Sequence, residues 1–540
     1  MNNLKQLKHN LIVFIKTKVF KQFLISILIG FTISSASIVT AKEIYLDYQA
    51  STPIDPVVLK AMWPYLTKEF GNPHASDHNY GKRAASAVNN ARLQVANLIG
   101  ARDPNSIIFT SGATEANNLA ILGTARALKG KRNKIITCIT EHKAVLETAK
   151  SLDQEGFEVV FLKVNQDGLI SLDELEKNLD SNTALVSIMT ANNEIGVIQP
   201  IGRIGKLVHK YGALLHTDAT QAVGKIPLNV ELDNIDLLSL SSHKIYGPKG
   251  VGVLYVHQGI KINPIMHGGG QEQAIRPGTV PVFLAVGLGK AAELAKDNLI
   301  SESQHIVKLR DSFLQELQQN KIKYLVHGSM QARIAGNLNI SFANIDGEEI
   351  IKKLPNLAVS LGSACSSSNS NLSYVVCALH TVVKPWGNPI RISFGRFTSE
   401  KDVKDAANEL ISVVKSVKTK TRVENKRASI QLREKYELAY VFLGSCPYCH
   451  IFAPTVKDFA KENNFPITGI TVDGGKVADF PNAKFDVKFA RQYNIESFPT
   501  LLARTNASEP FKVIVEGALT SKDDILKVFL AMEQSKEGIK

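Results

Sequence analysis

The chain has 540 residues, which is too long for one ordinary hydrophobic core and therefore predicts two or more domains. Hydrophobic residues make up 44% and charged residues 21%, values that are typical of globular proteins. The net charge of +13 comes from lysines spread along the chain, without a helix-turn-helix, zinc-finger or aromatic-basic pattern. We therefore interpret the charge as a basic surface and expect no nucleic-acid partner.

The N-terminus has the pattern of a targeting signal. Lysines between Lys5 and Lys21 precede an apolar stretch from Phe23 to Ile33, and small residues then lead to Ala41. The apolar stretch is shorter than the about 20 residues of a membrane-spanning helix. We expect residues 1–41 to be a cleaved signal peptide, with an uncleaved membrane anchor and a cytosolic extension as alternatives. The protein is accordingly expected in the periplasm or at a membrane, and in the cytoplasm if the signal is not functional.

Strand-like apolar runs alternate with amphipathic helical patterns between residues 42 and 419. The predicted strands are 107–110, 135–138, 159–162, 185–189 and 214–217. Helical patterns at 115–127 and 145–152 lie between them, so we predict an α/β fold with a mainly parallel sheet. The charged stretch 420–435 predicts a helical linker, and a second strand–helix pattern predicts another α/β domain over residues 436–540.

A lysine follows one predicted strand in a setting that suits a covalent cofactor. Lys244 comes shortly after the apolar run 235–240, and Ser241 and His243 stand just before it. Its amine can form a Schiff base with an aldehyde, while Ser241 and His243 can donate to a phosphate. Pyridoxal 5'-phosphate (PLP) carries both groups. Ser111–Glu115 also follows a strand and opens a helix, whose N-terminus is a further phosphate-binding element.

Four other polar residues follow predicted strands or lie in one, and each has an ordinary structural alternative. Asp218 can hold a pyridine nitrogen protonated, or cap a helix. Asn193 can bond the cofactor or a substrate carboxylate, or form a turn. His142 can stack on the cofactor ring, or serve a structural role. Arg391 can clamp a carboxylate, or form a surface ion pair.

The cysteines do not form a disulfide framework, because an odd number is spread over a long chain. Cys138 and Cys377 lie in apolar runs, and we expect both to be buried and inert. Cys365 lies among small polar residues in Gly362–Asn371, where an exposed thiol is suited to nucleophilic attack. Cys365 is therefore the predicted nucleophile of the large domain.

Residues 44 to about 410 resemble a cysteine desulfurase of the kind that serves iron–sulfur cluster assembly. The matching stretches are Tyr45–Tyr48, Gly71–Pro73, Ser111–Glu115, Thr140–Val145, Asn192–Val197, Asp218–Gln221, Ser241–Gly250, His267–Gly270, Arg276–Pro281 and Gly362–Cys365. The resemblance implies a type I PLP aminotransferase fold, with a large sheet domain and a small α+β domain. It also implies a homodimer with its sites at the subunit interface.

The resemblance assigns roles to the residues at the matching positions. It implies phosphate contacts from Ala113, Thr114, Ser241 and His243, and from Thr279 of the second subunit. It implies that His142 stacks on the PLP ring, Asp218 pairs with the ring nitrogen and Gln221 bonds the phenolic oxygen. Asn193, also a cofactor contact, would hold the substrate carboxylate together with Arg391.

The implied reaction converts L-cysteine to L-alanine. Lys244 would hold PLP and remove the α-proton, and Cys365 would take the substrate sulfur as a persulfide. A lyase acting on selenocysteine is an alternative of the same class. The chain departs from the family after Glu400, where it lacks the usual tail that meets a scaffold partner, so the sulfur-acceptor protein is open.

A second reactive motif lies in Cys446-Pro447-Tyr448-Cys449, which follows a predicted strand and opens a helix. The helix dipole would lower the pKa of the first thiol, so Cys446 is the predicted attacking sulfur and Cys449 the resolving one. No second cysteine pair lies nearby, so we expect a redox site and no metal. With Pro499 as the cis-proline, residues from about 436 to 535 resemble a thioredoxin-like domain.

Two functions remain open for the whole chain. In one, the dithiol of Cys446 and Cys449 reduces the Cys365 persulfide or relays its sulfur. In the other, the chain is an exported thiol–disulfide oxidoreductase or isomerase with a vestigial PLP domain. Intact Lys244, Asp218, His142 and Cys365 favour the first.

Overall fold

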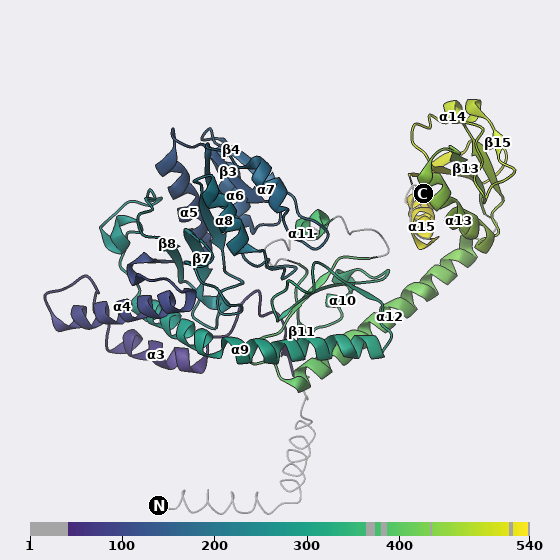
Figure 1. Ribbon diagram of the computed structural model, residues 1–540. Helices are drawn as coiled ribbons and strands as arrows, with labels where there is room; N and C mark the ends of the chain where they lie inside the picture. The colour runs from purple at the N-terminus through teal and green to yellow at the C-terminus, as the bar shows by residue number, and fades with distance from the viewer. Residues whose placement is uncertain (1–41, 363–372, 380–385, 433–434, 518–521, 538–540) are drawn as a thin grey trace, which may run out of the picture. The chain divides into compact units, whose positions relative to one another are not determined.

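The computed structural model describes residues 42–362, 373–379, 386–432, 435–517 and 522–537 (Figure 1). The predicted signal segment 1–41 and the predicted nucleophile Cys365 lie outside the described residues. Among the described helices, none is both long enough and apolar enough to cross a membrane.

A seven-stranded sheet forms the centre of the large domain. Its strands, in spatial order, are β2 (Ile107–Thr110), β8 (Gly252–Val256), β7 (Leu237–Ser241), β6 (Leu214–Asp218), β5 (Thr183–Ser187), β3 (Lys134–Cys138) and β4 (Glu158–Leu162). The pairs from β7 to β4 are parallel, and β8 is antiparallel to both of its neighbours. The sheet is thus mixed but mainly parallel, as predicted.

The predicted strands agree closely with the observed ones, apart from their ends. The strand expected at 185–189 is β5, which begins at Thr183 and ends at Ser187. The backbone N–H of Met189 donates to the side chain of Glu141 instead of to a neighbouring strand (2.8 Å). Most strands are buried along their whole length, which is expected where helices cover both faces of a parallel sheet.

Helices pack on both faces of this sheet, and two hydrophobic clusters form the core (Figure 1). One cluster lies under α5 (Ala113–Leu128) and α6 (Lys143–Asp153). The other lies under the remaining large-domain helices, which are α3 (Pro56–Thr67), α4 (Asn79–Ile99), α7 (Leu172–Asn178), α8 (Ile201–Lys210) and α9 (Val282–Gln319). The 3-10 turn η1 (Pro104–Ser106) leads into β2.

The antiparallel strand β8 aligns the two strands that flank it. Gly252 pairs with Thr110 of β2 on one side and with Ser241 of β7 on the other. A Cβ atom at residue 252 would lie 2.7 Å from Cα of Gly112 and 2.5 Å from the carbonyl oxygen of Leu240. Only glycine fits at this position, so the start of α5 can approach the end of β7 closely.

The small α+β unit contains two short sheets. β9 (Tyr324–Val326), β10 (Asn337–Phe342) and β12 (Ile390–Ser393) form an antiparallel sheet, and β1 (Ile44–Tyr45) pairs with β11 (Leu357–Ala358). The helices are α10 (Gly347–Ile351), α11 (Tyr374–Ala378) and α12 (Glu400–Leu432). This is the small domain that the resemblance implied.

One cysteine prediction is confirmed and one is wrong. Cys138 is buried in β3, and burial raises its pKa to about 12. Cys377 is exposed, contrary to the prediction. In α11 the neighbours Val375, Val376 and Ala378 face the core, and Cys377 lies on the other side of the helix.

The C-terminal residues form a separate five-stranded sheet. Its strands, in spatial order, are β15 (Lys484–Phe485), β14 (Ile467–Thr471), β13 (Glu437–Phe442), β16 (Thr500–Arg504) and β17 (Lys512–Glu516). β13, β14 and β15 are parallel, whereas β16 and β17 are antiparallel to their neighbours. The accompanying helices are α13 (Pro447–Glu462), α14 (Val487–Gln492) and α15 (Lys522–Glu537).

The 3-10 turn η3 (Gln271–Ala274) contains three consecutive non-glycine residues with positive φ: Glu272 at 45°, Gln273 at 61° and Ala274 at 61°. Each such residue costs about 1–2 kcal/mol. Glu272 is buried, and its carboxylate accepts from Arg92 (2.6 and 2.9 Å) and from the backbone N–H of Phe109 (2.7 Å). These charge-assisted bonds stabilise the turn in its strained conformation.

A buried histidine joins three neighbouring strands of the large sheet. His216 of β6 shares hydrogen bonds with Ser187 of β5 at Nδ1 (2.8 Å) and with Ser239 of β7 at Nε2 (3.0 Å). Burial lowers the pKa of His216 to about 4, although the nearby Asp218 opposes this effect. His216 is therefore neutral at pH 7.

We predict that acid weakens the large domain through His216. The unfolded chain binds a proton at this imidazole near pH 6.5 and the folded protein near pH 4, so the free energy of unfolding falls as the pH drops between these values. At pH 5 the loss through His216 is about 2 kcal/mol. Urea unfolding followed by tryptophan fluorescence measures it, because neither tryptophan lies in the C-terminal unit: Trp63 is in α3 of the large domain and Trp386 is in the small α+β unit. His216→Asn should flatten the dependence of the midpoint on pH, whereas His305→Asn, at an exposed position, should leave it as in the parent.

Candidate active site

A pocket of about 450 Å³ lies where the parallel strands of the large sheet end. It brings together ten residues predicted for the site, which are Ala113, Thr114, His142, Asn193, Asp218, Gln221, Ser241, His243, Lys244 and Arg391. Thr279 does not line the pocket and is exposed. Because parallel strands share one carboxyl edge, residues far apart in the sequence converge there.

The phosphate-binding elements lie at one side of this pocket. α5 begins at Ala113, and no side chain caps its first turn. The free backbone N–H groups and the positive end of the helix dipole suit a phosphate. Ser241 and His243 line the pocket beside them. Burial and, to a smaller extent, the charge of Lys244 lower the pKa of His243 to about 4, so the ring is neutral at pH 7.

An ion pair neutralises the acidic residue beside this phosphate site. Glu115 lies in the first turn of α5, where its charge would repel a phosphate. Arg276 donates to its carboxylate through Nε (2.8 Å) and Nη2 (3.3 Å), and the backbone N–H of Ser111 donates at 2.7 Å. Burial raises the pKa of Glu115, but these bonds outweigh it and lower the pKa below its ordinary value. The sequence alone did not assign this role to Arg276.

Lys244 reaches the pocket from a single 3-10 turn, η2 (Ser242–Lys244), that directly follows β7. Its Nζ donates to the carbonyl oxygens of Gln49 and Ala50, both at 2.7 Å. Thr52 fixes the turn, because its hydroxyl donates to the carbonyl of His243 and accepts from the backbone N–H of Tyr246. The position of Lys244 is therefore set by the bonds of its amine to two backbone carbonyls and by the bonds of Thr52 to its turn.

Asp218 ends β6 and is almost completely buried. Its Oδ2 accepts from Asn117 Nδ2 (2.8 Å), and its Oδ1 accepts from the backbone N–H of Thr220 (2.9 Å). The second bond belongs to a turn, because residues 219–236, all of them described, contain no helix, so the alternative role of Asp218 as a helix cap is wrong. The first bond orients the carboxylate in the pocket. Asn117 was not among the predicted site residues, although it lies one helical turn after Ala113 and so on the same face of α5.

His142 combines its structural alternative with a place in the pocket. It caps α6, because its Nδ1 accepts from the backbone N–H of Ala144 (3.1 Å). Burial lowers the pKa of His142, Asp218 opposes this, and Lys244 adds to it. The neutral ring therefore carries its proton on Nε2, which is the nitrogen left to donate.

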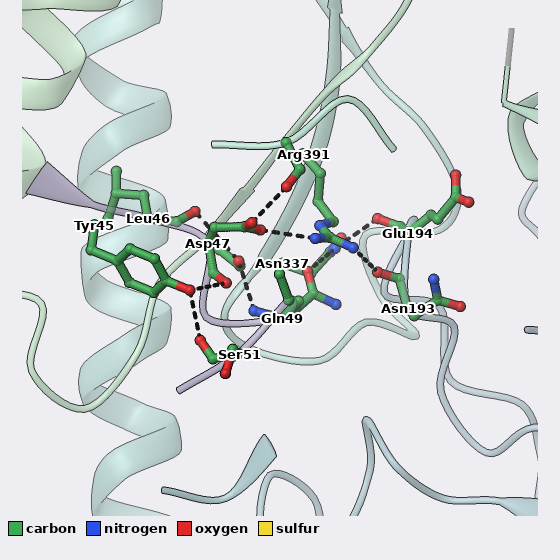
Figure 2. Close-up of polar contacts among 12 residues, drawn as sticks. Tyr45, Leu46, Asp47, Gln49, Ser51, Asn193, Glu194, Asn337 and Arg391 are labelled. Carbon is green, nitrogen blue, oxygen red and sulfur yellow. Dashed lines mark hydrogen bonds and ion pairs between the residues drawn. The ribbon is translucent and has the colours of Figure 1, made fainter. Parts of the chain in front are cut away.

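Arg391 is buried in an ion pair, so the alternative of a surface pair is wrong (Figure 2). Its Nη2 lies 2.8 Å from Asp47 Oδ1, and its Nη1 donates to the carbonyl oxygen of Asn193 (2.9 Å). Asp47 also accepts from the hydroxyl of Ser360 (2.6 Å). Asn337 links the same two segments, because its amide donates to Gln49 Oε1 (2.6 Å) and to the carbonyl of Glu194 (2.9 Å).

The donor set fits PLP and an amino acid. The uncapped start of α5 suits the phosphate, Asp218 suits the ring nitrogen, and the Lys244 amine suits the aldehyde. Among the described residues, Arg391 Nε and Asn193 Oδ1 are buried without a hydrogen-bond partner. Buried polar atoms in this condition are rare in native proteins, and they are expected where a ligand completes the bonding.

The C-terminal unit presents its two thiols at one end of a helix. Cys446 is the N-cap of α13, and its Sγ donates to the carbonyl oxygen of Phe498 (3.9 Å). The following Phe498–Pro499 peptide bond is cis. Cys449 is fully buried, and burial raises its pKa to about 12, so it remains a protonated thiol. The described residues contain no cluster of three or more potential metal ligands.

Asp473 holds the loop that precedes Cys446. Its carboxylate accepts from the backbone N–H groups of Gly444 (2.8 Å), Ser445 (3.1 Å) and Gly475 (2.9 Å). These backbone hydrogen bonds hold the pKa of Asp473 well below its ordinary range. The Asp473 carboxylate thus fixes the backbone directly before Cys446 and, with it, the position of the Cys446 thiol.

Comparison with known proteins divides the chain into the same two parts. The family Aminotransferase class-V matches residues 44–405, and the family TraF, F plasmid transfer operon protein, matches residues 411–530. Cysteine desulfurase IscS of Rickettsia africae is 47% identical over 373 residues, covering 69% of this chain and 91% of the relative.

Solved structures also match about two thirds of the chain. A NifS-like protein superposes with a TM-score of 0.65 and 35% identity, covering 69% of this chain and 99% of the other. A structure described as SspA in complex with cysteine gives 0.59 and 36%, covering 66% of this chain and 100% of the other. The chain therefore belongs to the class-V aminotransferases and, within them, to the family of the IscS cysteine desulfurases, which use PLP.

We predict that Arg391→Gln lowers kcat/KM for L-cysteine about 100-fold, mainly by raising KM. Removing a buried charged donor costs about 3 kcal/mol, part of which comes from Asp47 losing its partner. Alanine formation in the steady state measures the change. Arg102→Gln is the matched control, because Arg102 pairs with Glu231 at the surface. An unaltered KM in Arg391→Gln would show that the carboxylate binds elsewhere.

Proposed function

We propose that the protein is a PLP-dependent cysteine desulfurase that converts L-cysteine to L-alanine and takes the sulfur as a persulfide on Cys365. The carrying observation is a single pocket in which Lys244, Asp218 and the start of α5 meet the buried Arg391. The solved relative in complex with cysteine supports the substrate class.

PLP, when bound, withdraws electrons from the α-carbon of the substrate. Arg391 and Asn193 hold the carboxylate of L-cysteine, and Lys244 Nζ takes the proton from the α-carbon. The Cys365 thiolate attacks the substrate sulfur, so an S–S bond forms as the C–S bond breaks. The electron pair of the broken bond stays on the β-carbon, which gains a proton, and Lys244 Nζ returns the proton that it took to the α-carbon, so that alanine forms. His142 Nε2–H, neutral at pH 7, can donate beside the ring.

The proposed enzyme works as a homodimer. Apolar side chains on one face of α3 are exposed, namely Leu59, Trp63 and Leu66, of which Trp63 is 61% exposed. An apolar helical face of this kind is typical of an interaction surface. Thr279 is exposed and outside the pocket of its own chain, which suits a residue that completes the phosphate site of a second subunit.

Two substitutions test the desulfurase function. Lys244→Ala should remove both the visible absorbance of bound PLP and alanine formation, because the amine is needed for each. Cys365→Ser should keep the absorbance and form no alanine. Cys377→Ser, which replaces the exposed thiol of α11, should form alanine at the parent rate. Normal alanine release by Cys365→Ser would refute the assigned nucleophile.

We further propose that the C-terminal domain is thioredoxin-like and that its dithiol reduces the persulfide. The sheet order, the position of Cys446 at the start of α13 and the adjacent Pro499 support this assignment. Cys446 and Cys449 lose two electrons and two protons and form a disulfide, while the Cys365 persulfide becomes a thiol and hydrogen sulfide. A further round needs an external dithiol to reduce the disulfide. The pattern of residues 1–41 supports export, where such a built-in reductant would serve the enzyme.

A single-turnover experiment tests the reductive step. The protein is pre-reduced and loaded with PLP, and no thiol is added. Cys446→Ser should then release about tenfold less sulfide than the parent, because it lacks the thiol that attacks the persulfide and retains only the resolving thiol of Cys449. The first burst of alanine should be unchanged. Equal sulfide release by the parent and Cys446→Ser would refute the coupling, while leaving the desulfurase function intact.

A further inference from the structure

Lys225 lies next to the PLP pocket and takes no part in the proposed reaction of Lys244 and Cys365. Lys225 stands four residues after Gln221, and its Nζ donates to Gln221 Oε1 (2.7 Å). It lines a second cavity, of about 40 Å³, that adjoins the pocket, since Gln49 and Lys244 line both. Lys225 therefore touches the site only through another side chain.

The surroundings of this amine are unusual for a lysine. The cavity wall is largely apolar, and among the described residues Gln221 is the only hydrogen-bond partner of Nζ. Glu302, a carboxylate that lines the same cavity, is paired with Arg396 (2.8 Å). A lysine kept for stability alone would be expected to pair with a carboxylate, because buried charges are costly unless they are paired.

The charge of Lys225 is finely balanced. Burial, with smaller contributions from Lys244 and Arg391 and against the opposing effect of Glu302, lowers the pKa of Lys225 to about 7. Arg396, Tyr48 and Tyr246 are the other titratable groups along the same cavity. The ammonium form thus persists into the neutral range, where it is a pure hydrogen-bond donor.

A donor at this position decides which way the Gln221 amide faces. An ammonium can bond only the oxygen of the amide, so Oε1 points to Lys225 and the NH₂ group points away from it. That NH₂ group donates to the carbonyl oxygen of Gln49 (3.0 Å), on the side where Gln221 lines the PLP pocket. The reversed amide would place two donors against each other.

We propose that Lys225 is a positioning residue, which holds the Gln221 amide with its NH₂ group toward the pocket so that it donates to the phenolic oxygen of PLP. The proposal rests on the PLP site of the proposed function and does not depend on sulfur transfer. A donor at the phenolic oxygen weakens the attraction of that oxygen for the proton on the Lys244 nitrogen. Lys225 thereby lowers the pKa at which Lys244 releases this proton.

The visible absorbance of bound PLP, titrated with pH in the full-length protein without L-cysteine, measures this pKa directly. In Lys225→Met the midpoint should rise by about one unit, because the phenolic oxygen loses an oriented donor. Lys225→Arg retains a cationic donor and should stay near the parent midpoint. Lys210→Met, which removes an exposed positive charge, should not move it.

A double-mutant cycle separates orientation from simple charge. If Lys225 acts through the amide, Gln221→Ala should raise the midpoint by itself, and adding Lys225→Met should raise it no further. A midpoint unchanged in Lys225→Met, at full PLP content, would overturn the proposal. An equal shift with and without Gln221 would overturn it too, since Lys225 would then act by charge alone. Should Lys225→Met bind no PLP, Lys225→Gln provides the same comparison with a polar side chain. Failure of desulfurase activity would leave all these midpoints interpretable.

Discussion

The site depends on the register of one antiparallel strand. Gly252 of β8 is paired with Thr110 of β2 and with Ser241 of β7, so the helix that follows β2 and the lysine that follows β7 are fixed relative to each other. The hydrogen bonds between the strands align Thr110 and Ser241 along the strand direction. The lack of a side chain at Gly252 leaves room for Gly112 and the carbonyl oxygen of Leu240 beside it. A slip of one residue would turn every side chain of β8 to the opposite face and separate the two halves of the pocket.

Around this frame, the polar groups of the pocket are held by partners that are themselves fixed. Asp218 is held by Asn117, Glu115 by Arg276, and Arg391 by Asp47. In a poorly solvated pocket each of these charges is costly without its partner, so the pairs keep the groups oriented before any ligand arrives. In the proposal above, Lys225 orients Gln221 in the same way.

The sequence predicted the sheet and the residues at its carboxyl edge, because both follow from local patterns of apolar runs and polar strand ends. It could not predict contacts between distant segments. The partner of Arg391 is Asp47, 344 residues away, so the surface alternative stayed open until the small sheet was placed. Asn117 escaped notice for a similar reason, since its role depends on Asp218 of another strand. Cys377 was misjudged because apolar neighbours in a short helix do not determine which side each residue faces.

The strained turn at Glu272 has a consequence for how this sequence can drift. Three non-glycine residues hold a left-handed conformation there, and Arg92, 180 positions away, stabilises it through the Glu272 carboxylate. Neither residue can be exchanged alone without releasing the turn that leads to Arg276 and Thr279. Substitutions at 92 and 272 should therefore occur together among descendants of this chain, or be preceded by glycine at 273 or 274. Positions 92 and 272 would then show correlated substitutions, although they lie far apart in the sequence.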